Sequence, residues 1–267
     1  REAGTDGNTL QVSTCPSATA YEQEGATTVN DSSTAVGDTV VVAASGAALN
    51  VGDIISFSTT AATNDYDDGE QYQVTNISTN NVTIVQHPRG TGGLKRALTD
   101  GANIRRRWKY YDSVDGAPGT SAYVSARSGS NDEIHVVVVD EDGGISGVPG
   151  TVLETFSNLS KASDAKDPQG NDNYYPNVIY TKSQHIYWTK HNSSGSNWGN
   201  AASGTTFTAV NTPTLSSLSG GSNGSTVTTG QIKDAYDKFA DSETVDIGLI
   251  IAGPCDATHI ENMITIA

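Results

Sequence analysis

Short apolar stretches separated by turn-forming residues recur through the first third of the chain. Their alternation of apolar and polar positions and their content of β-branched residues predict strands. The predicted strands are residues 38–42, 53–58, 71–77 and 82–86. Short strands at such close spacing are typical of a small all-β barrel or sandwich.

The second half of the chain alternates apolar runs with segments of helical spacing. Residues 133–140 are nearly all apolar, as in a strand that is covered on both faces. Residues 151–159 begin with the spacing of a helical capping box, and their apolar side chains then repeat along one helical face. The same criteria predict helices at residues 174–183 and 232–239 and strands at residues 184–188 and 244–251. Because strands separated by helices pair in parallel through right-handed crossovers, the sequence predicts an α/β core layer with mainly parallel strands.

Charge and composition narrow the classes of function. The 267 residues include 15 Lys and Arg against 30 Asp and Glu, which gives a net charge of −15. Such a field repels phosphate, so nucleic acid is not an expected partner. Apolar runs such as residues 136–139 are far too short for membrane insertion, and no N-terminal stretch looks like a signal peptide.

Basic residues are concentrated in one part of the chain, where Asp100 is the one acid that opposes them. They are Arg89, Lys95, Arg96, Arg105, Arg106, Arg107 and Lys109. This concentration suggests an inter-subunit basic seam, in which the basic stretch of one copy meets the acidic surface of another. The alternatives are a solvated hinge between domains and a nucleic-acid patch. The patch ranks last because Trp108 is the one aromatic residue before the tyrosine pair and no stacking ladder accompanies it.

A candidate for nucleophilic catalysis is the Gly-x-Ser-x-Gly pattern of residues 220–224, centred on Ser222. Asp246 and His259 follow in the order that an α/β-hydrolase needs. A nucleophile elbow requires a strand immediately before the serine, whereas residues 212–219 are a loop rich in serine and proline. The hydrolase is therefore an alternative function, and we expect that the chain is not an enzyme.

Two acidic clusters are candidates for cation binding. Asp140, Glu141 and Asp142 follow the predicted buried strand and could hold magnesium or form a hydrated turn. Asp65, Asp67, Asp68 and Glu70 crowd one loop, but Gly69 stands at the fifth position and not at the sixth that a calcium loop of the EF-hand type requires, so we expect a solvated loop tip. The histidines His87, His135, His185, His191 and His259 show no paired ligand spacing, and we predict no metal and no cofactor.

The cysteines and the glycosylation triplets do not establish whether the protein is secreted. Cys15 and Cys255 can form one bridge or none. The Asn-x-Ser/Thr triplets begin at Asn30, Asn76, Asn81, Asn158, Asn192 and Asn223. A chain this rich in these residue types produces such triplets by chance, so we do not predict a secreted glycoprotein.

Four motifs follow one another in the second half of the chain: DGAPGTS at 115–121, DEIHVVVVDEDGGI at 132–145, GTVLE at 150–154 and SKASDAK at 160–166. In this order they resemble the contractile tail sheath proteins of myoviruses, particularly those of T-even-like and cyanobacterial phages. Near the start, GTDGNTLQV at 4–12 is similar to a strand of the family. Gly220, Gly221 and Gly224 resemble a glycine-rich turn of the family, although Asn223 stands where the family usually has an acid.

The resemblance implies an α/β core interrupted by an outward-facing β-rich insertion. It places the first core strand in residues 1–16, the insertion in residues 17–107 and the rest of the core in residues 108–267. The resemblance also implies a virion protein, assembled in the host bacterial cytoplasm, that packs as stacked hexameric rings around the inner tail tube protein and contracts to drive the tube into the host. No catalytic residues are carried over from the family.

Sheath neighbours are tied by terminal arms that add strands to adjacent subunits. The chain opens at Arg1 without a methionine and closes at Ala267 within an apolar stretch, so we expect a fragment that lacks these arms and is monomeric by itself. A further alternative, which does not rest on the resemblance, is a surface-binding or carbohydrate-binding β module in residues 17–107.

Overall fold

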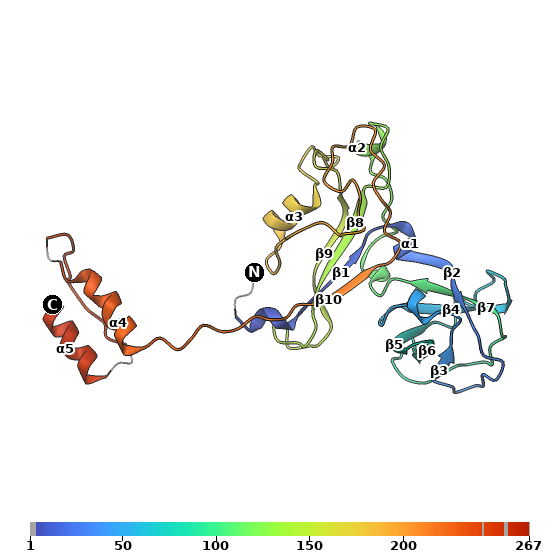
Figure 1. Cartoon of the computed structure of the whole chain (residues 1–267), viewed down its shortest axis with the longest axis horizontal. Helices are drawn as coiled ribbons and strands as arrows, with labels where there is room; N and C mark the ends of the chain where they lie inside the picture. Colours follow the sequence, from blue (N-terminus) through green and yellow to red (C-terminus); the bar gives the residue numbers. More distant parts are fainter. Residues whose placement is uncertain (1–3, 242, 254–255, 267) are drawn as a thin grey trace. The chain divides into compact units, whose positions relative to one another are not determined.

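In the computed structural model, which describes residues 4–241, 243–253 and 256–266, the strands form two antiparallel sheets. The chain divides into two units, residues 1–221 and residues 222–267, and each is described by itself (Figure 1). Both sheets belong to the first unit. The prediction of an α/β core with mainly parallel strands is therefore wrong, because every pairing between these strands is antiparallel.

The smaller sheet brings together strands that are far apart in the sequence. Its order is β10-β1-β8-β9, with β1 at Leu10–Cys15, β8 at Glu133–Asp140, β9 at Thr151–Ser160 and β10 at Thr214–Ser217. β1 lies in the centre and pairs with β8 on one side and β10 on the other. The N-terminal strand is therefore held by two segments from the second half of the chain.

The segment predicted as a helix at residues 151–159 is β9, and its irregular pairing explains the error. The register between β8 and β9 shifts twice, so β9 carries extra residues at both places. As a result Phe156 and Leu159, two of the three residues whose spacing predicted the helix, lie three positions apart and still pack into the same core. The third, Val152, is 38% exposed, and its neighbour Leu153 packs there instead. A bulged strand thus produced the spacing that is typical of a helix.

Strand β8 is buried on both faces, as its sequence predicts. Ile134, Val136 and Val138 point into a core that also contains residues of α3, Tyr175–Lys182. Val137 packs on the opposite face with Trp108. Burial on both faces did not require parallel neighbours, because the covering layers are helix and loop on one side and the Trp108 cluster on the other.

The remaining elements around this sheet are short. They are the 3-10 turns η1 (Asp6–Thr9) and η3 (Tyr111–Ser113) and the helices α1 (Ala18–Tyr21) and α2 (Ala122–Ser125). The helix predicted at residues 174–183 is confirmed as α3. The strand predicted at residues 184–188 is absent from this described segment, which turns away where Ser183 and the backbone of Gln184 both donate to the Glu154 carboxylate.

The larger sheet closes on itself as a six-stranded barrel. Its order is β2-β7-β4-β5-β6-β3, and a bridge between Val29 and Ala43 joins the ends of β2 and β3. The strands are β2 (Glu22–Thr28), β3 (Val40–Val42), β4 (Ile54–Ala61), β5 (Tyr72–Ser78), β6 (Asn81–Gln86) and β7 (Ala102–Arg107), and η2 is Gly46–Ala48. All four strands predicted in this region are present, and Phe57, Tyr72 and Ile104 fill the interior.

Two buried side chains, separated by one residue in the sequence, join the barrel to the smaller sheet. Trp108 donates from Nε1 to the Ser13 hydroxyl at 2.8 Å. Arg106 is fully buried and donates from Nη2 to the carbonyls of Thr19 and Asn211 at 2.8 and 3.0 Å. These bonds cross from the end of β7 to segments that flank β1 and β10, so the barrel is tied to the sheet by its own last strand.

The second unit is helical. It contains α4 (Thr229–Tyr236), η4 (Asp237–Phe239) and α5 (Ala257–Ile266), which confirms the helix predicted at residues 232–239. The strand predicted at residues 244–251 is wrong: this described segment pairs with no other strand, and Leu249 and Ile251 are 79% and 76% exposed. Among the described residues no helix is both long and apolar enough to cross a membrane.

Replacement of Val137 by Asp should unfold the smaller sheet. An unpaired carboxylate at this fully buried position costs several kcal/mol, a large part of a stability of about 5–15 kcal/mol. Thermal unfolding followed by circular dichroism checks this. Val36→Asp is the matched control, because Val36 is 70% exposed; an unchanged melting transition in Val137→Asp would contradict the assignment of β8.

Candidate functional site

The basic stretch does not form a continuous exposed surface. Arg105 is 6% exposed and Arg106 is fully buried, whereas Arg89 and Lys95 are exposed. Arg107 pairs with Glu22 at 2.5 Å, and Lys109 lies with its ammonium 5.1 Å from the Tyr110 ring. Most of these cations are therefore engaged within the chain, and their meeting with an acidic face of another copy stays a prediction.

The acidic loop at residues 65–70 supplies partners for these cations. Asp68 forms an ion pair with Arg105, and Glu70 pairs with Arg96 at 3.1 Å. Barrel closure thus brings two oppositely charged segments of the sequence together. Among the described residues no group of three or more His, Cys, Asp or Glu side chains could hold a metal ion.

The acids that follow β8 hold a turn. Asp140 is buried, and its Oδ2 accepts bonds from the backbone N–H groups of Ile145 and Ser146 at 3.0 and 2.6 Å and from the Ser146 hydroxyl. Glu141 accepts a bond from the Gln11 amide at 2.7 Å, and Asp142 is exposed. The cluster forms a turn, as one of the two interpretations expects, but Asp140 is held by bonds within the chain and is not hydrated.

Ser222, Asp246 and His259 are not assembled as a catalytic triad. Ser222 and Asp246 are exposed, whereas His259 is buried beside the Tyr236 ring at a centroid distance of 5.8 Å. No hydrogen bond joins the three side chains within the described part of the chain. Residues 212–219 are not entirely the loop that we predicted, because they contain β10, but this strand ends at Ser217 and so does not lead directly into the serine as an elbow needs.

The glycine motif around residue 221 has a structural explanation. The Asn8 side chain donates to the Gly221 carbonyl at 2.9 Å and accepts from the Gly221 N–H at 2.7 Å. A Cβ atom at residue 221 would lie 2.1 Å from the Gly4 carbonyl oxygen. Two sequence motifs at opposite ends of the first unit are therefore packed so closely that only glycine fits.

His135 is bonded through both of its ring nitrogens. Its Nδ1 accepts from the Asn158 N–H at 3.0 Å, so Nε2 carries the proton and donates to the Gly116 carbonyl at 2.9 Å. Burial lowers its pKa, which keeps the ring neutral. His87 is half-buried, and His185 lies outside any strand, contrary to our prediction for it.

The thiol of Cys15 is free and buried, and burial raises its pKa to about 12. Cys255 lies outside the described residues, so the predicted alternatives of one bridge or none are not resolved there.

Asp132 joins three of the sequence motifs. This fully buried carboxylate accepts bonds from the Ser121 N–H at 2.8 Å, the Ser121 hydroxyl at 2.9 Å and the Ser160 hydroxyl at 2.5 Å. Its backbone carbonyl accepts from the Lys161 N–H. The motifs at residues 115–121, 132–145 and 160–166 thus meet at one buried acid.

The analysis of the sequence missed Lys161, the next residue of this cluster. Its ammonium is fully buried and donates to the carbonyls of Pro16 and Asn131 at 2.7 and 2.8 Å. Burial lowers its pKa to about 8, although the nearby Asp132 acts in the opposite direction. Its place in the motif at residues 160–166 was the one signal that could have drawn attention to it.

Asp53 is a further buried acid and lies close to Arg106. Its Oδ2 accepts from the Asn50 N–H at 2.7 Å. Burial raises its pKa to about 7, and the Asn50 bond and the positive charge of Arg106 only partly offset this effect.

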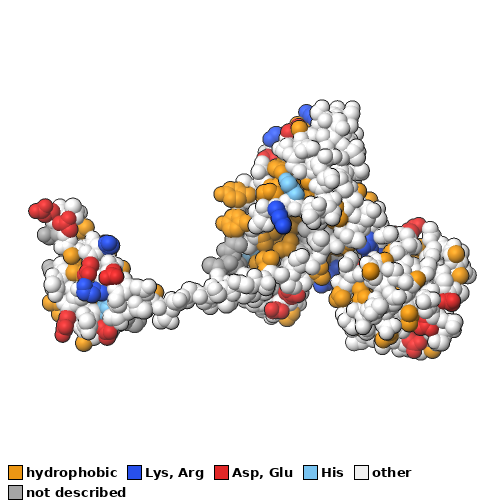
Figure 2. Space-filling view, in the orientation of Figure 1, with side chains coloured by type: hydrophobic (Ala, Val, Ile, Leu, Met, Phe, Trp, Pro, Cys, Tyr) orange, Lys and Arg blue, Asp and Glu red, His pale blue; other side chains and the backbone are white. Residues whose placement is uncertain are grey.

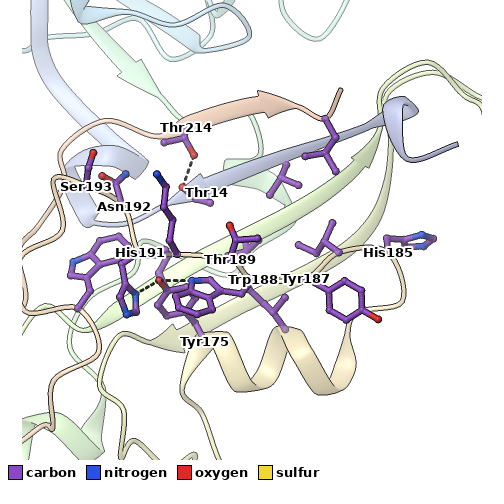
Figure 3. A pocket seen from close by; sticks show the side chains of 18 residues that line it. Thr14, Tyr175, His185, Tyr187, Trp188, Thr189, His191, Asn192, Ser193 and Thr214 are labelled. Carbon is purple, nitrogen blue, oxygen red and sulfur yellow. Dashed lines mark hydrogen bonds between the residues drawn. The ribbon is translucent and has the colours of Figure 1, made fainter. Parts of the chain in front are cut away.

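A groove of about 520 Å³ lies on the smaller sheet beside α3. Its floor is formed by sheet residues such as Val12, Ile134 and Val136, and its wall by residues 185–193 (Figure 3). Figure 2 shows hydrophobic side chains gathered over this part of the first unit. Thr14 and Thr214 close the floor with a bond between their hydroxyls at 2.7 Å.

A chain of aromatic side chains orders one end of the groove. Trp188 donates from Nε1 to the Tyr175 hydroxyl at 3.1 Å, and the same hydroxyl is hydrogen-bonded to Nδ1 of His191 at 2.6 Å (Figure 3). Burial lowers the pKa of His191 and raises that of Tyr175. The network is therefore uncharged and fixes the orientation of the rings.

Comparison of the chain with protein-family models, with curated proteins and with solved structures found no match.

Replacement of Asp132 by Ala should destabilise the first unit by about 3 kcal/mol, because the N–H and hydroxyl of the half-buried Ser121 and the buried Ser160 hydroxyl lose their acceptor. Urea unfolding measures the change. Asp115→Ala is the control, since Asp115 belongs to the same motifs but is exposed. Equal stability of the two variants would show that Asp132 does not hold the motifs together.

Asp53→Asn should remove a pH dependence of stability. The folded-state pKa of about 7, against an ordinary 3.8, means that the folded chain binds more protons than the unfolded chain between about pH 4 and pH 7. The free energy of unfolding therefore falls as the pH rises through this window. The variant should melt a few °C above the wild type at pH 8 and at nearly the same temperature at pH 4. A difference that is equal at both pH values would contradict the assignment.

Proposed function

We propose that this chain is a structural subunit of a myovirus contractile tail sheath, which acts by packing against copies of itself around an inner tail tube. The observation that carries the proposal is the ordered run of sheath-like motifs between residues 115 and 166. The polar residues of these motifs bond to one another inside the first unit. Asp132 and His135 are both buried and hydrogen-bonded in this way.

A sheath subunit has to remain rigid while its contacts with neighbours are exchanged. A buried network whose members are hydrogen-bonded favours one arrangement of the chain, because any other arrangement leaves desolvated polar groups without partners. The bonds of Asp132 to Ser121 and Ser160, together with those of Lys161, supply such a network. This use of polar residues supports a mechanical role better than a catalytic one.

Strand β9 is the site that we propose for a neighbouring subunit. Among the described strands it pairs only with β8, and so it forms an edge of the smaller sheet. An edge strand carries unpaired backbone groups that can accept a strand from another chain. The terminal arms of sheath subunits supply strands of this kind, so the stacked hexameric rings implied by the resemblance could be linked here.

Electron microscopy of the protein expressed at its full natural length tests the proposal. We expect tubes or stacked rings. The double variant Thr155→Lys, Ser157→Lys places charge at exposed positions of the β9 edge and should abolish the tubes without lowering the melting temperature.

Thr91→Lys, at an exposed position in the barrel region, is the matched control and should still assemble. Absence of tubes and rings from the wild type under all assembly conditions would refute the sheath function. Normal tubes in the β9 variant would refute the proposed edge alone.

A further inference from the structure

The groove differs in charge from the rest of the chain. The chain carries 30 acidic residues, yet none of the described residues that line the groove is acidic. Lys190, His185 and His191 lie along its wall. In the described part of the chain the Lys190 ammonium has no hydrogen-bond or ion-pair partner. The groove therefore favours an anionic group over a cationic one.

Aromatic rings stand at its surface. The Tyr187 side chain is 56% exposed, and the half-buried Trp188 is held in place by its bond to Tyr175. Tyr175 and Trp188 also meet edge to face at a centroid distance of 6.3 Å. Because these contacts fix the indole ring before any ligand arrives, little side-chain entropy is lost on binding.

Neutral polar groups complete the lining. Asn192 accepts from the Ser194 N–H through its side-chain oxygen at 2.8 Å, which leaves its amide as a donor. The hydroxyls of Thr14 and Thr189 belong to the same groove. Fixed rings, uncharged hydrogen-bonding groups and one free cation are thus assembled in a volume within the usual range of ligand sites, about 300–1,000 Å³.

We propose that this groove binds an oligosaccharide that carries carboxylate groups. The C–H face of a sugar ring packs on the rings of Tyr187 and Trp188, its hydroxyls bond with Asn192 and Thr189, and its carboxylate pairs with Lys190. The proposal concerns a different surface from the β9 edge and does not depend on the sheath function. A neutral sugar would use the rings without the lysine, and it therefore binds more weakly.

Isothermal titration with galacturonic acid oligomers, and with neutral galactose oligomers of equal length, tests the site. The wild type should bind the acidic oligomer at least ten times more tightly than the neutral one. Tyr187→Ala should weaken binding of both oligomers at least tenfold, and Lys190→Gln should remove the preference between them. Lys182→Gln is the matched control, because Lys182 is an exposed cation on α3 outside the groove and its loss should change nothing.

Circular dichroism melting of each variant shows whether it is folded, and since Tyr187 and Lys190 are both exposed we expect no change. Absence of saturable binding to the wild type would overturn the proposal, as would equal affinity for the acidic and neutral oligomers. Sedimentation provides a further check. Self-association that Tyr187→Ala and Lys190→Gln both abolish would show that a second copy covers the groove, and this result would also overturn the proposal.

Discussion

The burial of Trp108 against the smaller sheet is the contact on which the first unit depends. Strand β7 completes the barrel, and the next residue places its indole on the face of β8 that carries Val137 and Val139. The bond from its Nε1 to Ser13 fixes the ring against the central strand β1. Two residues earlier, Arg106 is buried between both layers. The barrel and the sheet are therefore not joined by a flexible linker at this point, because apolar burial and directed hydrogen bonds act within three consecutive residues.

Many of the charged side chains are also paired or hydrogen-bonded within the chain. The acidic loop and the basic β7 strand neutralise each other across the barrel, most clearly through Asp68 and Arg105. Asp132 and Lys161 are buried farther along the chain, and each has several hydrogen bonds that offset the loss of water. Because so many of the prominent charges are used internally, the unpaired Lys190 in an acid-free groove is the more notable feature.

Local patterns predicted the barrel well and the smaller sheet poorly, for a physical reason. Barrel strands such as β6 alternate regularly, and a period of two can be read without knowing the partner strand. In β9 the spacing depends on how bulges fit its partner β8, so the same residues look helical when read alone. Residues 244–251 were predicted to be a buried strand because they are largely apolar. Apolar residues alone do not determine whether another strand is present to pair with them, and in the structure this described segment has no pairing strand.

The candidate sites could likewise be predicted only in part, because their contacts join segments that are distant in the sequence. The basic cluster was visible in the sequence, but the pairing of Arg96 with Glu70 depends on barrel closure. The Lys161 ammonium bonds to the carbonyl of Pro16, and the groove brings Trp188 together with Val12. The members of each pair are more than a hundred positions apart in the sequence, so no local spacing connects them.

The central position of β1 determines the order in which the first unit can form. The barrel strands occupy a continuous stretch from Glu22 to Arg107, so they can pair as soon as that stretch has left the ribosome. β1 has to wait for β8 and then for β10, which ends at Ser217. Contacts of such long sequence separation form slowly, because the intervening chain must be ordered first. During synthesis the N-terminal strand consequently remains without its partners while a finished barrel already stands beside it.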